Sequence, residues 1–524
     1  MSQQKSENRE VPKAAGNRRQ TRNARTTEGG KAVPVKEKER QLKLSFATAE
    51  NPRGRGAESR RDMDRSMLRL QKVRKVKSKH KSVGPARMEG VIERLEEAFE
   101  KVAANKGAPG PDRQSIEQVQ EHLNELMPAL CEALLKGIYR PGDIRRVWIP
   151  KAGGGQRGLG IPNVVDRMVQ EAIRLVIEPE YEPTFHESSH GFRPNRSCQT
   201  AITEAKRYVG EGKEWVVDLD LEKFFDRVHH QRLMGRLAKR LKDKRLLAVI
   251  GRMLKAKVVM PDGVKVSTEE GVPQGGPLSP LLSNIVLSEL DEELARRGHR
   301  FVRYADDCNI YVRSQRAGVR VMASVTKFIN KRLRLKVNES KSAVARPETR
   351  HFLGYRLQPE EGGRVEIMLS ERSEKRLREH IREFTPRTCG RSLEDSIAKV
   401  NGYLHGWLGH FGICTSGIER NIQNADAHIR RRLRALVLQH WKTKRTIARR
   451  LIQLGVHRKT AWRHVYEGHK SFWALSHSPA VDRGLRNAYF AKRGLVSLLD
   501  YFHRLWAAIH APAQLSLQLG TARP

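Results

Sequence analysis

Two pairs of aspartates are the residues of this sequence best suited to do chemistry. Asp218 and Asp220 stand two apart in an apolar run, so on a β-strand both would lie on one face. Asp306 and Asp307 are adjacent, and neighbouring carboxylates repel each other unless a cation holds them. Carboxylates brought together from separate strands suit Mg²⁺, and two such ions about 4 Å apart promote in-line displacement at phosphorus. An Asp-Asp pair taken alone, however, is most often a solvated turn.

Predicted strands position both aspartate pairs. The apolar run Trp215 to Leu221 predicts a buried strand, and residues 301–304 and 309–313 predict paired strands with Ala-Asp-Asp-Cys at their tip. This mixture of strands and helices predicts an α+β fold in which helices cover one face of a sheet. From the spacing of apolar residues we expect helices at 91–102, 163–178, 281–294, 317–334, 394–411, 428–441, 444–453, 459–466 and 493–509.

Composition points to a polyanionic partner. The 524 residues predict two or three domains, and 100 Lys and Arg against 59 Asp and Glu give a net charge of +41. Such a charge attracts nucleic acid, although a binding protein without chemistry has the same composition. The five cysteines form no Cys-x-x-Cys pair, which argues against a zinc ribbon. We expect no signal peptide and no membrane span, and therefore an intracellular protein.

Short motifs that follow one another in a fixed order surround the aspartates and indicate what they could do. Tyr304-Ala305-Asp306-Asp307 resembles the Tyr-x-Asp-Asp box of reverse transcriptases, and residues 218–226 (DLDLEKFFD) resemble their first carboxylate motif. Residues 271–284 (GVPQGGPLSPLLSN) resemble the loop on the nucleotide and template side. Residues 338–341 (NESK) resemble a later motif whose Lys approaches the pyrophosphate, and residues 352–355 (FLGY) resemble the primer-side turn. Each match alone is weak, but their order makes coincidence remote.

This resemblance implies an RNA-directed DNA polymerase with a right-hand fold of fingers, palm and thumb. The palm would hold an antiparallel sheet, and a helical domain would follow it. Asp220, Asp306 and Asp307 would be the catalytic ligands of two Mg²⁺ ions, with Leu221 lending its backbone carbonyl, while Asp218 would be structural. Phe225 would exclude a ribose 2′-hydroxyl. The residues implied to contact the incoming nucleotide are Lys151, Arg157, Phe225, Gln274 and Lys341.

Further motifs narrow the resemblance to group II intron proteins. Residues 105–112 (NKGAPGPD), 188–197 (SSHGFRPNRS) and 401–407 (NGYLHGW) resemble segments of group II intron reverse transcriptases, and the similarity continues nearly to the end. It implies a maturase that binds the intron RNA, assists its splicing and copies it into DNA during retrohoming. The partners would be intron RNA, target and primer DNA and dNTPs, in the bacterial cytoplasm. Because it lacks Cys-x-x-Cys pairs, the sequence looks more like the group II intron proteins without an endonuclease, the bacterial class IIC type.

The basic C-terminal part supplies the expected RNA contacts. Arg430, Arg431, Arg432 and Arg434 are predicted to bind RNA phosphates, because a clustered set of guanidinium groups suits them. Trp407 and Trp441 could stack on bases, but aromatics at helical spacing favour a core position.

We expect a disordered basic arm at residues 1–87 and fingers and palm at 88–369. The thumb would start at 370–393, a helical thumb and maturase domain would occupy 394–510, and a tail would end the chain at 511–524. Two alternatives remain open, namely a domesticated or host-defence reverse transcriptase and a non-catalytic RNA chaperone. The oligomeric state, the intron, the DNA target and the priming route are open as well.

Overall fold

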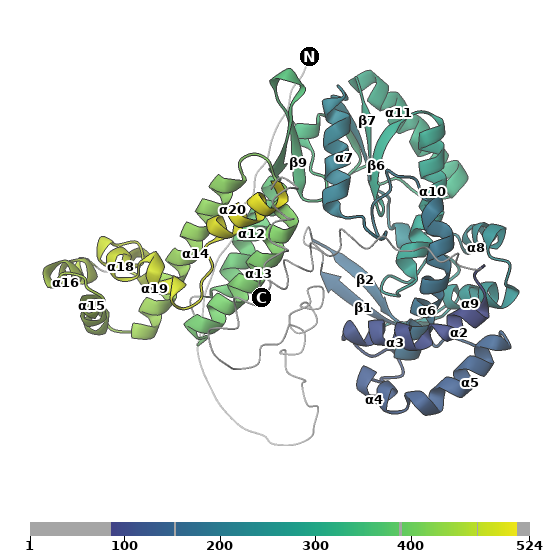
Figure 1. Cartoon of the computed structure of the whole chain (residues 1–524), viewed down its shortest axis with the longest axis horizontal. Coiled ribbons are helices and arrows are strands. Elements are labelled where there is room, and N and C mark those ends of the chain that lie inside the picture. The colour runs from purple at the N-terminus through teal and green to yellow at the C-terminus, as the bar shows by residue number, and fades with distance from the viewer. Residues whose placement is uncertain (1–84, 151–153, 387–389, 469, 511–524) are drawn as a thin grey trace, which may run out of the picture. The chain divides into compact units, whose positions relative to one another are not determined.

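The computed structural model describes residues 85–150, 154–386, 390–468 and 470–510 (Figure 1). Most of the predicted basic arm, the tail and Lys151 lie outside the described residues. The α+β class is confirmed, because the described residues form three sheets and a helical part that follows residue 370. In the described residues no helix is long and apolar enough to cross a membrane.

The fingers part combines helices with a small mixed sheet of order β2-β1-β4-β5. Strand β1 pairs antiparallel with β2 and parallel with β4. Helix α6 is buried along most of its length, with apolar side chains such as Met168 and Ile173 in the core, and it contacts α2 and α3. The elements are α2 (Met88–Glu93), α3 (Leu95–Ala104), α4 (Ile116–Glu121), α5 (Leu123–Leu135), α6 (Val164–Tyr181), β1 (Ile144–Pro150), β2 (Gln156–Ile161), β4 (Val258–Val259) and β5 (Lys265–Val266).

The palm sheet has the order β6-β7-β3-β8 and is antiparallel throughout. Alternate side chains of β3 enter different cores: Val217 packs in the core that includes α10 and α11, and Val216 packs in the core that includes α7. The expectation of helices on one face is therefore wrong, because apolar residues on both faces of this sheet need cover. The palm elements are α7 (Cys198–Gly210), β3 (Trp215–Leu219), α8 (His230–Arg240), α9 (Lys244–Leu254), α10 (Ser279–Arg296), β6 (Arg300–Tyr304), β7 (Asp307–Val312), α11 (Gln315–Phe328) and β8 (Ala343–Ala345).

The C-terminal helices share their hydrophobic core with the β9–β10 hairpin. Tyr355 of β9 is fully buried, and its hydroxyl donates to the carbonyl of His410 in α13. Trp407 and Trp441 lie in this core, as predicted. The elements are β9 (Tyr355–Pro359), β10 (Val365–Leu369), α12 (Glu371–Phe384), α13 (Leu393–Phe411), α14 (Ile418–Trp441), α15 (Lys444–Gln453), α16 (Arg458–Tyr466), α17 (Phe472–Leu475), α18 (Pro479–Gly484), α19 (Asn487–Ala491) and α20 (Leu498–His510).

Candidate active site

A two-residue turn joins β6 to β7 and carries the adjacent aspartates. Tyr304 pairs with Asp307 across the hairpin, so only Ala305 and Asp306 lie in the turn. The predicted tip was longer, whereas Asp307 already begins β7. Ala305 has φ of +57°, in the left-handed region that a tight hairpin turn of this length requires. Asp306 is thereby held at the apex and Asp307 at the start of a strand.

Strand pairing brings Asp220 to the same place. In the antiparallel pairing of β3 with β7, Leu219 stands opposite Cys308. Asp220, which follows Leu219, therefore lies beside Asp307, which precedes Cys308. The three aspartates predicted to be catalytic are neighbours at one end of the palm sheet.

Electrostatics at this end of the sheet reflect the crowding of like charges. Burial and the nearby Asp220 carboxylate raise the pKa of Asp306 above its ordinary value. The pKa of Asp307 rises to about 7, because its surroundings desolvate it and Asp306 and Asp220 repel its charge. Asp307 nevertheless keeps an exposed edge. Lys341 opposes both shifts, so at least one cationic side chain already reaches the carboxylates.

The segment after α11 holds Asp220 in position. The Asn338 side-chain amide donates to Asp220 Oδ2 at 2.9 Å, and Lys341 Nζ lies 3.3 Å from the same oxygen. The backbone amide of Asn338 also donates to the Asp220 carbonyl at 2.8 Å, and the Asp220 amide donates to Ser342 Oγ at 3.0 Å. The motif at 338–341 thus docks on the first carboxylate motif. Asn338 had no predicted role, because its contact joins residues far apart in the sequence.

The donor set at this end of the sheet fits a hard divalent cation. It offers carboxylate oxygens and no sulfur ligand within the turn, and oxygen is what Mg²⁺ prefers. The mutual repulsion of the carboxylates is also what a bound cation would relieve. Across the described ranges, no three His, Cys, Asp or Glu side chains are positioned to ligate one ion together. Asp220 instead has its Oδ2 engaged by Asn338 and Lys341.

Two of the predicted nucleotide contacts meet beside these carboxylates. Arg157 Nε of β2 donates to Gln274 Oε1 at 2.5 Å, and the Gly160 amide donates to the Gln274 carbonyl at 2.7 Å. Gly275 fits this junction at φ of +123°, where a Cβ would lie 2.5 Å from the Gly160 carbonyl oxygen. The positive charge of Arg157 partly opposes the rise in the pKa of Asp306, so this charge acts on the carboxylates. The loop that contains Gln274 and the β1–β2 hairpin are therefore joined by hydrogen bonds next to the carboxylates.

Phe225 lies at the base of the same loop. Its ring meets that of Phe224 edge-on with centroids 5.2 Å apart, and its carbonyl accepts from the Val272 amide at 2.7 Å. The ring is almost fully buried. This is a rigid position for a residue predicted to limit the space around a sugar.

Asp218 forms an ion pair with Arg350, which gives this partly buried carboxylate a structural role without catalysis. Arg350 donates to its Oδ2 through Nε at 2.9 Å and through Nη2, and Nη2 also donates to the Lys341 carbonyl at 2.8 Å. Asp218 therefore joins β3 to the segment that carries Lys341. This matches its predicted structural role.

A buried arginine that sequence reasoning missed supports the turn through hydrogen bonds. Arg303 donates to the Ala305 carbonyl at 2.9 Å, to Asn284 Oδ1 at 3.1 Å and to Ser189 Oγ at 2.7 Å. Its remaining hydrogen bonds go to both carboxylate oxygens of Asp291. In sequence, Arg303 was one polar residue of a strand, and only its complete burial distinguishes it.

The four arginines predicted to bind RNA divide into two kinds. Arg432 and Arg434 are buried, and they donate to the Thr385 and Leu485 carbonyls, respectively. The expectation that these two face RNA fails, since their guanidinium groups tie helices together. Arg431 lies over the Trp473 ring at 4.1 Å, and Arg430 stands 3.9 Å from Asp426 while keeping a quarter of its side chain exposed. These two remain candidates.

Comparison with known families defines the class of protein. Residues 149–357 match the family Reverse transcriptase (RNA-dependent DNA polymerase), and residues 374–453 match the Group II intron, maturase-specific domain. Two successive segments of the chain are thus similar to a reverse transcriptase domain and to a maturase-specific domain. These matches confirm the resemblance to group II intron reverse transcriptases and maturases.

Individual proteins are similar to the chain over part of their length. The chain is 41% identical over 209 residues to protein YkfC of Escherichia coli (strain K12), covering 39% of this chain and 55% of YkfC. It is 29% identical over 335 residues to group II intron-encoded protein LtrA of Lactococcus lactis subsp. cremoris, covering 51% of this chain and 55% of LtrA. The chain therefore spans about half the length of these relatives. A telomerase structure from Candida albicans matches with a TM-score of 0.36 at 12% identity, covering 67% of this chain and 69% of that chain.

Proposed function

We propose that this protein is an RNA-directed DNA polymerase that binds a group II intron RNA, assists its splicing and copies it into DNA. The observation that carries the polymerase proposal is the meeting of Asp220, Asp306 and Asp307 at one end of the palm sheet. The maturase-specific segment that follows it supports the splicing role. The nucleic-acid substrates of the proposed polymerase imply an intracellular, cytoplasmic location for the protein.

In the proposed reaction a primer 3′-hydroxyl attacks the α-phosphate of a dNTP, and pyrophosphate leaves. Two Mg²⁺ ions held by Asp220, Asp306, Asp307 and the Leu221 carbonyl would stabilise the charge on the attacking and leaving oxygens. Arg157 and Lys341, whose charges both act to lower the pKa of Asp306, carry the positive charge that a triphosphate needs. Lys151, on the segment between β1 and β2, is proposed to join them.

The rest of the loop orients the nucleotide. Gln274 is fixed by Arg157 and by Gly160, so its position does not depend on the substrate. Phe225, buried under the same loop, presents a rigid surface where a ribose 2′-hydroxyl would lie. Preorganised contacts of this kind lower the barrier, because they are not reorganised during the reaction.

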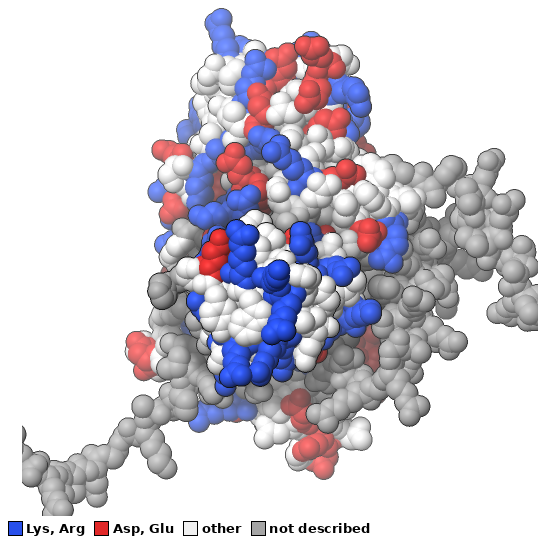
Figure 2. All heavy atoms as spheres, turned by 90° about the vertical axis from the view of Figure 1, so that its left-hand side faces the viewer, with Lys and Arg blue, Asp and Glu red and all other residues white. Residues whose placement is uncertain are grey.

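The proposed RNA-binding surface lies on α15 and α16. Figure 2 shows Lys and Arg side chains gathered over this end of the molecule, with few acidic residues among them. Folded RNA is bound largely through phosphates and 2′-hydroxyls, which suits flexible exposed cations. The exposed basic residues of these helices are Arg445, Arg449, Arg450, Arg458, Lys459 and Arg463.

A splicing assay with matched variants tests the two roles separately. RNA that co-purifies with the protein is sequenced to identify the intron, and its splicing is then measured at near-physiological Mg²⁺. Wild type and Asp306→Ala should both promote splicing, whereas Arg445→Glu/Arg449→Glu/Arg458→Glu should bind the intron weakly and fail. Splicing that is unaffected by the triple variant would contradict the RNA surface. Absence of any splicing effect with wild type would leave a polymerase without a maturase role.

A further inference from the structure

Phe192 has an unusual combination of exposure and backbone conformation. It follows Gly191 in the loop between α6 and α7, and 47% of its surface is exposed. Its φ is +59°, in the left-handed region that a bulky side chain rarely adopts. Its ring belongs to neither hydrophobic core and, among the described residues, pairs with no other aromatic ring or cation. Protein packing therefore does not account for the ring.

The next residue anchors the loop firmly. Arg193 keeps only 5% of its side chain exposed and donates to the carbonyls of His186 and Ser189 at 2.6 and 2.7 Å. It also pairs with Glu182 at 2.9 Å and lies over the Phe185 ring. A strained backbone persists only where its surroundings over-determine it, and Arg193 supplies that constraint directly beside Phe192.

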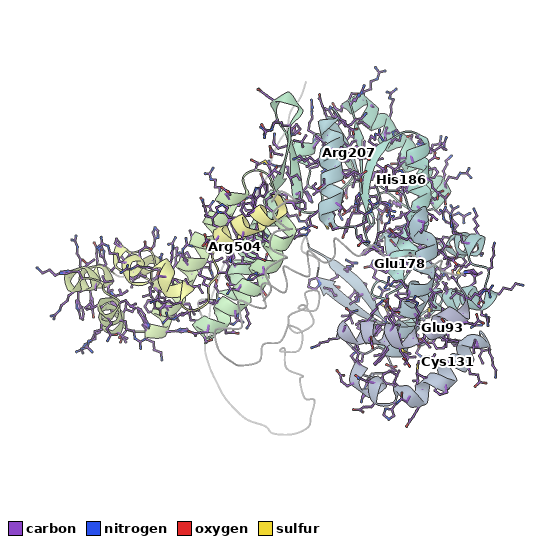
Figure 3. The ribbon with its side chains drawn as sticks, in the orientation of Figure 1. Glu93, Cys131, Glu178, His186, Arg207 and Arg504 are labelled. Carbon is purple, nitrogen blue, oxygen red and sulfur yellow. The ribbon has the colours of Figure 1, made fainter. Side chains whose placement is uncertain are left out.

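The preceding residues fix the loop to the palm sheet. Residues 188–190 run beside β6, with the Arg303 amide donating to the Ser188 carbonyl and the His190 amide donating to the Arg303 carbonyl, both at 2.8 Å. His186, labelled in Figure 3, lies beside this sheet with its ring 4.9 Å from that of Phe301. The loop therefore moves with the strand that ends at the catalytic turn.

Gly191 brings the loop into contact with that turn. A Cβ on Gly191 would lie 2.3 Å from the Ala305 amide nitrogen and 3.0 Å from the Tyr304 carbonyl carbon. The Gly191 carbonyl also accepts from Asn284 Nδ2 at 2.8 Å. The loop contacts the turn at Gly191 and Ala305. Phe192 directly follows Gly191 and is therefore the first side chain after this contact.

We propose that Phe192 is a stacking platform for a nucleobase of the primer–template bound at the Ala305-Asp306 turn. Aromatic rings stack on bases of any sequence, which suits a polymerase that must bind every sequence it copies. The strained, anchored backbone holds the ring exposed before substrate arrives. This inference rests on the proposed polymerase function and adds a base-binding position that is distinct from the carboxylates and from the nucleotide residues.

Three variants separate the ring from the backbone. Phe192→Asn removes the ring and places a residue that tolerates the left-handed conformation, so the variant should fold at least as stably as wild type. Phe192→Trp keeps a stacking surface. Val319→Asn removes an exposed apolar side chain of α11 and is the matched control for a general loss of apolar surface.

The primary measurement is the equilibrium Kd for an RNA template annealed to a DNA primer, which needs no catalysis. Phe192→Asn should bind about tenfold more weakly, while Phe192→Trp and Val319→Asn bind as wild type does. Abasic nucleotides placed in turn along the primer end and the paired template then identify the stacked base. At that position the abasic site should weaken wild type and leave Phe192→Asn unchanged, which also tells primer from template.

Failure of the stacking proposal can be distinguished from failure of the polymerase proposal. If Phe192→Asn folds normally and binds the primer–template with wild-type affinity, the stacking platform is refuted, whatever the protein polymerises. If wild type binds the primer–template but adds no nucleotide to it, the proposed polymerase fails, while the Kd comparison still decides the role of Phe192.

Discussion

Arg303 of β6 and Asp291 of α10 form a two-pronged ion pair in which neither side chain exposes any surface. The remaining N–H groups of the guanidinium reach the Ala305 carbonyl, Asn284 and Ser189. One buried cation therefore joins the Ala305-Asp306 turn, the loop before α7 and the long palm helix. Asp291 balances its charge, and the other contacts set the position of the turn.

Breaking this pair should destabilise the fold strongly. Asp291→Asn leaves a buried guanidinium without its counter-charge, which costs about 3–5 kcal/mol of unfolding free energy. Arg303→Met/Asp291→Leu removes both charges and should recover much of that loss. Urea denaturation measures both. The double variant should still extend primers poorly, because the Ala305 carbonyl has lost its donor. A stable double variant with wild-type activity would refute the positioning role.

Gly191→Ala should separate the loop from the turn. The added Cβ meets backbone atoms of Tyr304 and Ala305, which cannot rotate away as a side chain would. We expect the turn to shift and primer extension to fall by about a hundredfold, a typical loss when reacting groups are displaced by about 1 Å. Gly235→Ala, in α8 with open space around it, is the control and should keep full activity. Equal activity of the two variants would contradict the close contact.

These contacts show what the sequence can and cannot predict. The β6–β7 hairpin and the order of the motifs were predictable, because alternating apolar residues and turn residues act locally. The extent of the turn was not, since pairing of Tyr304 with Asp307 depends on the partner strand. Asn338 and Gly191 matter through contacts with residues more than a hundred positions away. No local pattern reports such a contact.

The arginine cluster of α14 illustrates a second limit. Sequence places Arg430, Arg431, Arg432 and Arg434 on one helix, but a helix turns about 100° per residue and exposes only part of its circumference. Packing against α12 and α18 buries Arg432 and Arg434, which then satisfy backbone carbonyls. Charge alone could not tell these structural arginines from the exposed ones.

Asp243 should make stability depend on pH. Burial pushes its pKa upward, but hydrogen bonds from Arg245 and from the Met88 amide outweigh this effect and lower the pKa to about 2. Since the folded-state pKa lies below the unfolded value of about 4, the ionised carboxylate stabilises the fold above pH 4. This contribution is lost as pH falls towards 2.

The matched variant is Asp243→Asn, which still caps α9 but carries no charge. Wild type should be more stable than the variant at neutral pH, and the difference in unfolding free energy should shrink between about pH 4 and pH 2. A difference that stays constant over this range would show that the charge contributes nothing.

Asp307 should couple metal binding to pH. Its pKa of about 7 means that a proton competes with Mg²⁺ for the carboxylate near neutrality. The Mg²⁺ concentration for half-maximal primer extension should therefore be higher at pH 6 than at pH 8. Asp226→Asn, outside the carboxylate cluster, should show the same pH dependence as wild type. A half-maximal concentration that does not change with pH would mean that Asp307 does not compete with protons for the ion.

Addition of one dNTP to a DNA primer on an RNA template in Mg²⁺ tests the central claim most directly. Wild type should extend the primer, and Asp306→Asn should slow single-turnover addition by about a thousandfold or more while binding the primer–template as tightly. Wild-type protein that binds the primer–template without extending it, or an Asp306→Asn variant that extends it at the wild-type rate, would contradict the assignment of these carboxylates as a polymerase active site.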